Sequence, residues 1–99
     1  MTTQPPSRAS GVELTEADMA RGSARIQRTV SRRLHMAARI NGAAVRWKDR
    51  TLQIFLGNKP VAAVDFSPAE LSHAAHSPYK ASVARKISEL TGRVLDVTP

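Results

Sequence analysis

Five arginines and one histidine recur at helical spacing in the N-terminal half of the chain. The intervals between them alternate between four and three residues, through Arg21, Arg25, Arg28, Arg32, His35 and Arg39. Such positions share one face of an α-helix, and the arginines fall in a stripe about 60° wide with the histidine at its edge. No acidic residue occurs between Met19 and Lys48. Because a guanidinium binds phosphate through two parallel hydrogen bonds, this arginine face predicts contact with a polyanion.

The helix that positions the arginine face is expected to run from Thr15 to Asn41. Thr15 is a typical N-cap residue, and Asp18 stands where a capping box places its acidic partner. Gly42 can end the helix in the left-handed conformation. Gly22 is the weak position, because glycine costs ~1 kcal/mol relative to alanine in a helix, so a kink or a frayed turn is expected near it. The opposite face is apolar and predicts contact with a core, through Met19, Ile26, Val30, Leu34, Ala37 and Ile40.

The composition of the chain also indicates a polyanion binder. The 99 residues carry a formal net charge of +7 at pH 7, and 11 of the 15 basic residues are arginine. Such a balance is typical of proteins that bind nucleic acid or an acidic protein surface. Binding to a membrane surface is less favoured, because the apolar face of the helix has no Trp or Phe and is needed to cover a core.

Other features limit the class of protein. The chain has no cysteine, which excludes disulfide and thiolate chemistry and favours a cytoplasmic location. No apolar run approaches the ~20 residues of a membrane span, and the N-terminus lacks the apolar segment of a signal peptide. Residues 1–11 have no apolar periodicity and are expected to be a disordered tail, which leaves 12–99 as one small domain. Only four aromatic residues are available for the core, so a homodimer that buries more area would fit.

After Gly42 the hydrophobic period changes from helical to twofold. Short runs separated by polar turns predict three strands of an antiparallel meander, at 43–47, 51–56 and 61–66, with turns at 48–50 and 57–60. The strand face expected to meet the core carries Val45, Trp47, Leu52, Ile54, Leu56, Val64 and Phe66. Phe55 falls on the other face, where it is either covered by another element or available for contact.

Two serine-proline pairs indicate helix starts in the last third of the chain. Ser67-Pro68 supplies an N-cap and an N1 residue for a short helix at 69–75. Ser77-Pro78 repeats the signal for a longer helix that ends at Thr91-Gly92. Its apolar face carries Tyr79, Val83, Ile87 and Leu90. Residues 93–99 are expected to form a short edge strand or a packed tail.

The predicted fold class is α+β, with a long amphipathic helix, a three-stranded antiparallel meander, a short helix and a C-terminal helix. The order over residues 15–91 is similar to that of the double-stranded-RNA-binding domain. Lys48-Asp49-Arg50 replaces that family's glycine-proline-histidine loop, and only Lys80 lies near its pair of lysines. Three strands and a helix over 43–75, joined by Asp65-Phe66-Ser67-Pro68-Ala69-Glu70, also resemble small DNA-binding domains of plant transcription factors and phage integrases.

Residues 67–91 also follow the order of a helix-turn-helix motif, which is a helix, a tight turn and a second helix. Its recognition helix would carry the basic residues Lys80, Arg85 and Lys86. However, His76 and Pro78 occupy turn positions where a glycine and a small apolar residue are usual. The alternative is a helix that covers the sheet.

No constellation for catalysis is visible in the sequence. It has no evident pairing of a nucleophile with a base and no glycine-rich phosphate loop, so an enzyme is not expected. His73 and His76 are spaced like two metal ligands, but only Glu70 is near enough in sequence to join them. No metal or cofactor is therefore expected.

The sequence predicts a small regulatory or architectural protein whose arginine face follows the phosphates of DNA or RNA. The residues expected to bind are Arg21, Arg25, Arg28, Arg32, His35, Arg39, Arg46, Lys48, Arg50, Lys80, Arg85 and Lys86. Replacing Arg25, Arg28 and Arg32 by Gln is expected to weaken binding and leave the fold intact. The alternative is a small phage-like adaptor or inhibitor that docks its basic face on an acidic surface of a larger protein or ribonucleoprotein complex.

Overall fold

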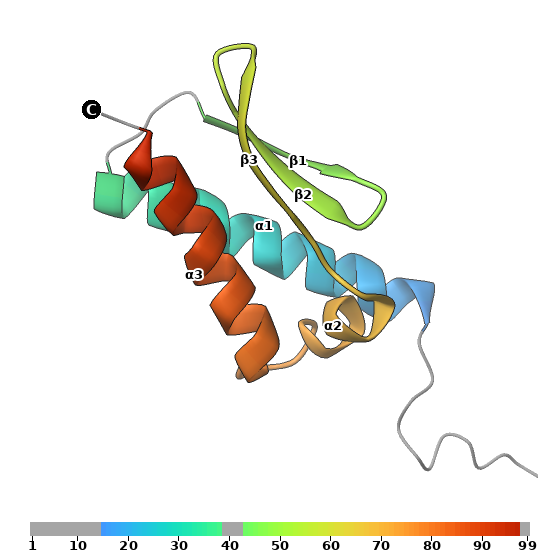
Figure 1. Ribbon diagram of the computed structural model, residues 1–99. Helices are drawn as coiled ribbons and strands as arrows, with labels where there is room; N and C mark the ends of the chain where they lie inside the picture. Colours follow the sequence, from blue (N-terminus) through green and yellow to red (C-terminus); the bar gives the residue numbers. More distant parts are fainter. Residues whose placement is uncertain (1–14, 39–42, 98–99) are drawn as a thin grey trace, which may run out of the picture.

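The fold confirms the predicted α+β order of elements. The computed structural model of the protein describes residues 15–38 and 43–97. Its elements are α1 (Glu16–Ala38), β1 (Ala43–Lys48), β2 (Thr51–Leu56), β3 (Lys59–Asp65), α2 (Pro68–His73) and α3 (Ala81–Asp96). The strands form one antiparallel sheet in the order β1-β2-β3. Figure 1 shows α1 and α3 on the same side of this sheet, and the predicted tail at 1–11 lies outside the described residues.

Helix α1 begins at the predicted cap and stays helical through Gly22. The Oγ1 atom of Thr15 accepts a hydrogen bond of 3.0 Å from the backbone N–H of Asp18. Gly22 is buried, and a Cβ atom at this position would lie 1.6 Å from the carbonyl oxygen of Leu71 in α2. The glycine therefore allows the backbones of α1 and α2 to touch, and the predicted break is wrong. The predicted end at Asn41-Gly42 lies outside the described residues.

Two-residue turns join the three strands. The first residue of each turn has a left-handed backbone, with φ 56° at Asp49 and φ 66° at Gly57. Strand β3 begins at Lys59, so the predicted turn at 57–60 is shorter than expected. The pairing of β2 with β3 shifts next to Ile54, which leaves Val61 as the extra residue of a β-bulge.

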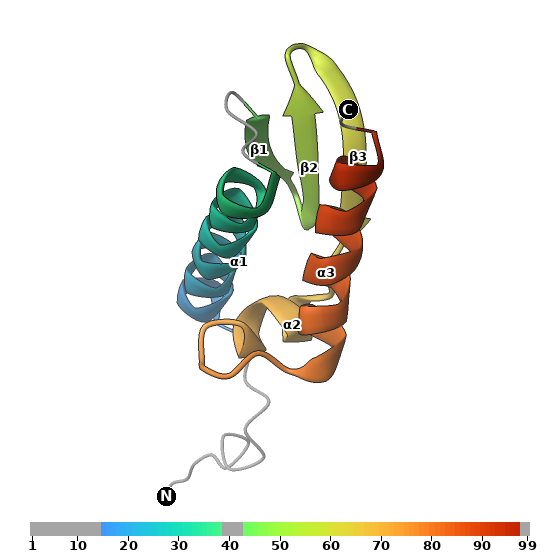
Figure 2. The same cartoon turned by 90° about the vertical axis from the view of Figure 1, so that its left-hand side faces the viewer.

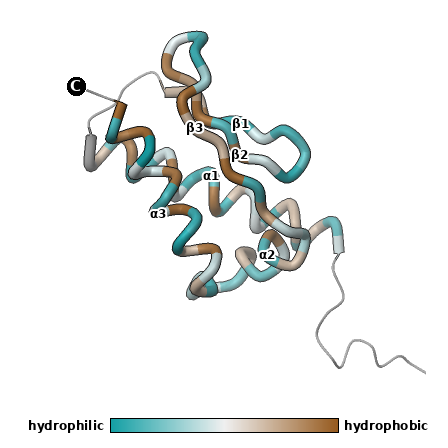
Figure 3. The backbone as a smooth tube through the Cα atoms, in the orientation of Figure 1, coloured by the Kyte–Doolittle hydropathy of each residue, from teal (hydrophilic) through white to brown (hydrophobic). Residues whose placement is uncertain are grey.

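The core lies between the inner face of the sheet and the helices. It is formed by Ile26, Val30, Leu34, Leu52, Ile54, Phe66, Leu71, Ala74, Val83, Ile87, Leu90 and Val94. Val45, Trp47 and Val64 are half-buried against it, as the predicted strand face requires. Hydrophobic and hydrophilic positions alternate along α1 and α3 with the helical period (Figure 3). Within the described residues, no helix is long and apolar enough to cross a membrane.

The two C-terminal helices agree only in part with their predicted starts. For α2, Ser67 and Glu70 form a reciprocal capping box with Pro68 in the first turn, as predicted. In contrast, α3 begins after Lys80 and not at Ser77-Pro78. It also continues to Asp96, because Val94 extends the buried face, so the predicted edge strand or tail at 93–99 is wrong for the described part.

Side chains from the two long helices reach both edge strands of the sheet. From α1, Gln27 Nε2 donates to the carbonyl oxygen of Val45 in β1 at 2.9 Å. From α3, Lys86 Nζ donates to the carbonyl oxygen of Asp65 at 2.8 Å, and Arg93 Nη1 donates to that of Ala63 at 3.2 Å. Figure 2 shows the corresponding arrangement, with α1 beside β1 and α3 beside β3. These bonds satisfy part of the strand edges and hold the helices against the sheet.

Candidate nucleic-acid interface

The most outward residues of α1 in the arginine face are Arg28, Arg32 and His35. All three side chains are exposed, on the side of the helix opposite the buried Ile26 and Val30. Within residues 15–38 and 43–97, none of these three side chains has a hydrogen bond or an ion pair. The two guanidinium groups can therefore bind an anion without first giving up a protein partner.

Arg21 lies on the same face, toward the N-terminal end of α1. Its guanidinium forms an ion pair with Asp18, and its side chain is 62% exposed. An exposed pair between neighbouring helical turns contributes about 0–1 kcal/mol. A phosphate can compete for Arg21, because the existing pair is weak.

Arg25 is engaged inside the fold. Its Nη1 atom donates to the carbonyl oxygen of Ala74 at 2.8 Å, and its guanidinium carbon lies 4.6 Å from the centre of the Tyr79 ring. The Tyr79 hydroxyl is in turn 2.7 Å from the Thr29 Oγ1 atom. Arg25 therefore fastens α1 to the segment between α2 and α3. A variant that removes it changes the fold's contacts, contrary to the prediction that Arg25 can be replaced without such an effect.

Two further arginines of this segment are Arg33 and Arg39. Arg39 lies outside the described residues. Arg33, outside the arginine face, is oriented toward α3, with its Nη1 atom 3.5 Å from the Ser88 Oγ atom. The described part of the candidate interface on α1 thus consists of the exposed residues Arg21, Arg28, Arg32 and His35.

Arg46 and Lys48 of β1 are exposed on a different surface. They alternate with Val45 and Trp47, which pack inward against the core, so they project from the outer face of the sheet. The guanidinium of Arg46 lies 5.7 Å from the centre of the Phe55 ring on the same face. The structure does not bring these two cations together with the outward residues of α1.

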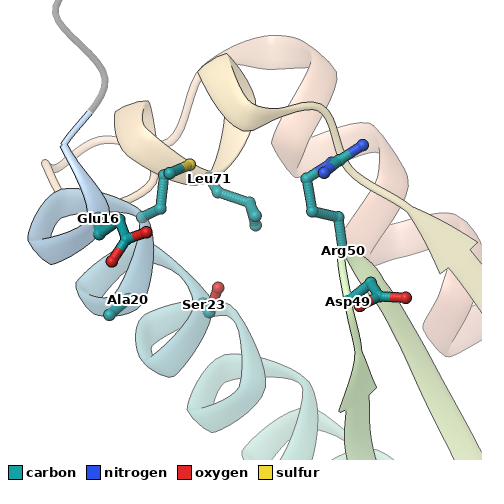
Figure 4. A pocket seen from close by; sticks show the side chains of 7 residues that line it. Glu16, Ala20, Ser23, Asp49, Arg50 and Leu71 are labelled. Atoms are coloured by element: carbon teal, nitrogen blue, oxygen red, sulfur yellow. The ribbon is translucent and has the colours of Figure 1, made fainter.

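Arg50 lines a hollow between α1, α2 and the β1–β2 turn. The hollow has a volume of about 390 Å³ and is lined by Glu16, Met19, Ala20, Ser23, Asp49, Arg50 and Leu71. Figure 4 shows Glu16, Ala20 and Ser23 of α1 on one side of the hollow and Asp49 and Arg50 of the turn on the other. Its lining carries two carboxylates and one arginine, so it does not favour an anion. Arg50 is therefore poorly placed to bind phosphate inside the hollow.

Helix α3 covers the sheet, as the alternative to a helix-turn-helix predicted. Lys80 and Arg85 are exposed, whereas Lys86 is half-buried and contacts other side chains of the protein. The Nζ atom of Lys86 donates to Glu70 Oε1 at 2.7 Å and lies 5.4 Å from the centre of the Phe66 ring. Partial burial acts to raise the pKa of Glu70, but hydrogen bonds from Lys86, the Ser67 N–H and Ser82 outweigh it and lower that pKa.

Two histidines lie at the C-terminal end of α2, His73 as its last residue and His76 shortly after it. His73 is half-buried and His76 is exposed. Among the residues that the structure describes, no group of three or more His, Cys, Asp or Glu side chains could hold a metal ion.

The contact between Arg25 and Tyr79, and the lack of a hydrogen bond at the Gln53 side chain within the described residues, were not predicted from the sequence. The contact between Arg25 and Tyr79 joins distant segments, and no local pattern reveals it. Gln53 is half-buried on the outer sheet face, and its side chain has no hydrogen bond within the described part of the chain. Its alternation with the core residues of β2 predicts the outward position, which the structure confirms, but not the absence of a hydrogen bond.

Comparisons with known proteins identify no relative. No protein-family model matches the chain, and neither the curated proteins nor the solved structures contain a significant match.

Proposed function

We propose that the protein binds nucleic acid through the outward side of α1. Arg28 and Arg32 contact phosphates at the centre of this surface, and Arg21 and His35 extend it at either end. The observation that supports the proposal best is the pair of exposed arginines without a protein partner in the described structure. A small protein with such a surface would act as a regulatory or architectural binder of DNA or RNA.

The distribution of acidic side chains supports a net attraction at this surface. No acidic residue follows Asp18 within α1. Elsewhere, carboxylates pair with cations outside the outward side of α1, as in Glu70 with Lys86 and Glu89 with Arg93. The positive charge of Arg28 and Arg32 is therefore not neutralised by a neighbour on the same helix. Phosphate binding would replace only water at the two guanidinium groups.

The dependence of affinity on salt tests the proposal. Each arginine that neutralises a duplex phosphate releases counterions, which contributes about −0.9 to the slope of log affinity against log salt. Contacts from Arg21, Arg28 and Arg32 predict a contribution of about −3 to that slope. The double variant Arg28→Gln/Arg32→Gln should lose about 2 units of slope. It should fold normally, because Gln and Arg have similar helix propensities.

A control with the same change in net charge separates the surface from the overall charge. Arg33→Gln/Lys59→Gln removes two exposed cations outside the outward side of α1. This control should lose clearly less slope than Arg28→Gln/Arg32→Gln, as measured by fluorescence anisotropy with a labelled duplex. Equal losses would mean that only net charge matters. If the folded Arg28→Gln/Arg32→Gln variant binds as the parent does, the proposed surface is wrong.

A second candidate is docking on an acidic surface of a larger protein or ribonucleoprotein complex. It is favoured by exposed apolar side chains, since Met36 on α1 is 71% exposed and Val97 after α3 is 56% exposed. Arginine and methionine are both enriched in protein–protein interfaces. This function predicts that the protein captures one defined partner from nuclease-treated lysate. Met36→Gln should reduce that capture and leave nucleic-acid affinity unchanged.

A further inference from the structure

Within residues 15–38 and 43–97, no helix lies over the outer face of the sheet. Helices α1 and α3 lie on the other face (Figures 1 and 2). The register of the strands places nine outward side chains in three rows, Ala44-Phe55-Pro60, Arg46-Gln53-Ala63 and Lys48-Thr51-Asp65. None of these nine residues is buried. We refer to them together as the open sheet face.

Phe55 is the aromatic residue at the middle of one row of the open sheet face. It lies on the central strand, and its direct neighbours across the sheet are Ala44 and Pro60, both without a long side chain. Arg46 is beside it, with its guanidinium carbon 5.7 Å from the ring centre. An aromatic ring with an adjacent guanidinium on an uncovered sheet is suited to stack a nucleobase. The present contact of Arg46 would yield easily, since an exposed cation–π pair is weak.

The polar groups next to Phe55 also suit an unpaired nucleotide. Gln53 follows in the adjacent row, and its amide has no partner within the described residues. A free amide can both donate to and accept from the edge of a base. Lys48 is exposed one row further and can reach a backbone phosphate. In the three strands the only carboxylate is that of Asp65, which accepts a hydrogen bond from Thr51.

We propose that the open sheet face binds a single-stranded nucleic acid. One base stacks on Phe55, Gln53 bonds to the edge of a base, and Arg46 and Lys48 contact the backbone. A duplex is a poor ligand for this face, because its bases are stacked on one another and offer no free face to the ring. The site lies on the outer side of the sheet, whereas α1 lies on the inner side, so it does not depend on the function proposed for α1.

Substitutions at Phe55 test this site directly. Phe55→Leu keeps an apolar side chain but removes the ring, and Phe55→Tyr keeps the ring. Affinity for a labelled oligothymidylate, measured by fluorescence anisotropy, should fall about tenfold in Phe55→Leu and change by less than about twofold in Phe55→Tyr. Both variants should bind a labelled duplex as the parent does. Thermal unfolding of each variant verifies that the fold is retained.

Two further measurements separate this site from α1. Arg28→Gln/Arg32→Gln should preserve the tenfold difference between Phe55→Tyr and Phe55→Leu even if duplex binding is lost. Photocrosslinking with an oligonucleotide that carries 5-iodouracil should label the peptide that contains Phe55. Crosslinks confined to α1 would overturn the proposal. Equal affinities of folded Phe55→Leu and the parent would also overturn it. If the parent does not bind the single strand, the proposal is wrong, and a protein becomes the candidate partner of the open sheet face.

Discussion

Replacing Gly22 by alanine gives opposite predictions from the helix alone and from the packed structure. Alanine favours a helix interior by ~1 kcal/mol over glycine, so α1 alone predicts a more stable protein. In the structure, the new Cβ atom would lie 1.6 Å from the carbonyl oxygen of Leu71 and 2.8 Å from its carbonyl carbon. Both are backbone atoms of α2, so no rotamer change can relieve the contact. The helices must move apart, which disturbs the buried contacts of Leu71 and Ala74.

We therefore expect Gly22→Ala to lower the free energy of unfolding by about 2 kcal/mol, within the range of overpacked cores. For a domain of this size that loss corresponds to a fall in Tm of roughly 8–16 °C. Gly92→Ala is the matched control, because nothing lies within 4 Å of a Cβ atom at that helical position. It should raise stability by about 0.5–1 kcal/mol. Urea denaturation measures both, and a Gly22→Ala protein at least as stable as the parent would refute the close helix contact.

Two further predictions concern side chains that hold the helices. Arg25→Gln should cost about 1–2 kcal/mol, because the bond to Ala74 and the contact with Tyr79 are lost, whereas Arg28→Gln should cost less than about 0.5 kcal/mol in urea denaturation. The pKa of Glu70 is lowered in the folded state, so the ionised carboxylate stabilises the fold above its ordinary pKa, and this contribution is lost as pH falls through the folded pKa. Glu70→Gln should therefore make stability less dependent on pH below that ordinary pKa, and an unchanged acid-unfolding profile would contradict this role.

The order of elements was predictable because burial imposes a period on each one. Alternation in β2 placed Leu52 and Ile54 inward, and both are fully buried. The spacing of Ile26, Val30 and Leu34 likewise identified the buried side of α1. These patterns arise from secondary structure packed on one layer, so a local window of sequence contains them.

The errors arose where contacts between distant segments override local preference. Gly22 was predicted to break or fray α1. That prediction failed because the backbone that Gly22 contacts, at Leu71, belongs to another helix and is not visible in the local sequence. Gly92 was predicted to end α3, but the helix continues for about one more turn to Asp96, because Val94 is buried in the core. Propensity sets a small preference at each residue, and burial of one apolar side chain exceeds it.

In the candidate site, too, contacts between distant segments decide what each side chain does, and the local sequence does not reveal them. Arg25 and Arg28 are the same residue type on the same predicted face, yet Arg25 binds Ala74 and Tyr79 while Arg28 is exposed and has no partner in the described structure. A helical period gives the direction of each side chain but not the position of α2 or of the segment after it. The described basic residues of the predicted site are therefore divided among α1, the outer face of the sheet, the hollow lined by Arg50, and α3 with the residue before it. A single ligand can contact only part of this set, so its salt dependence should reflect two or three cations and not the net charge of +7.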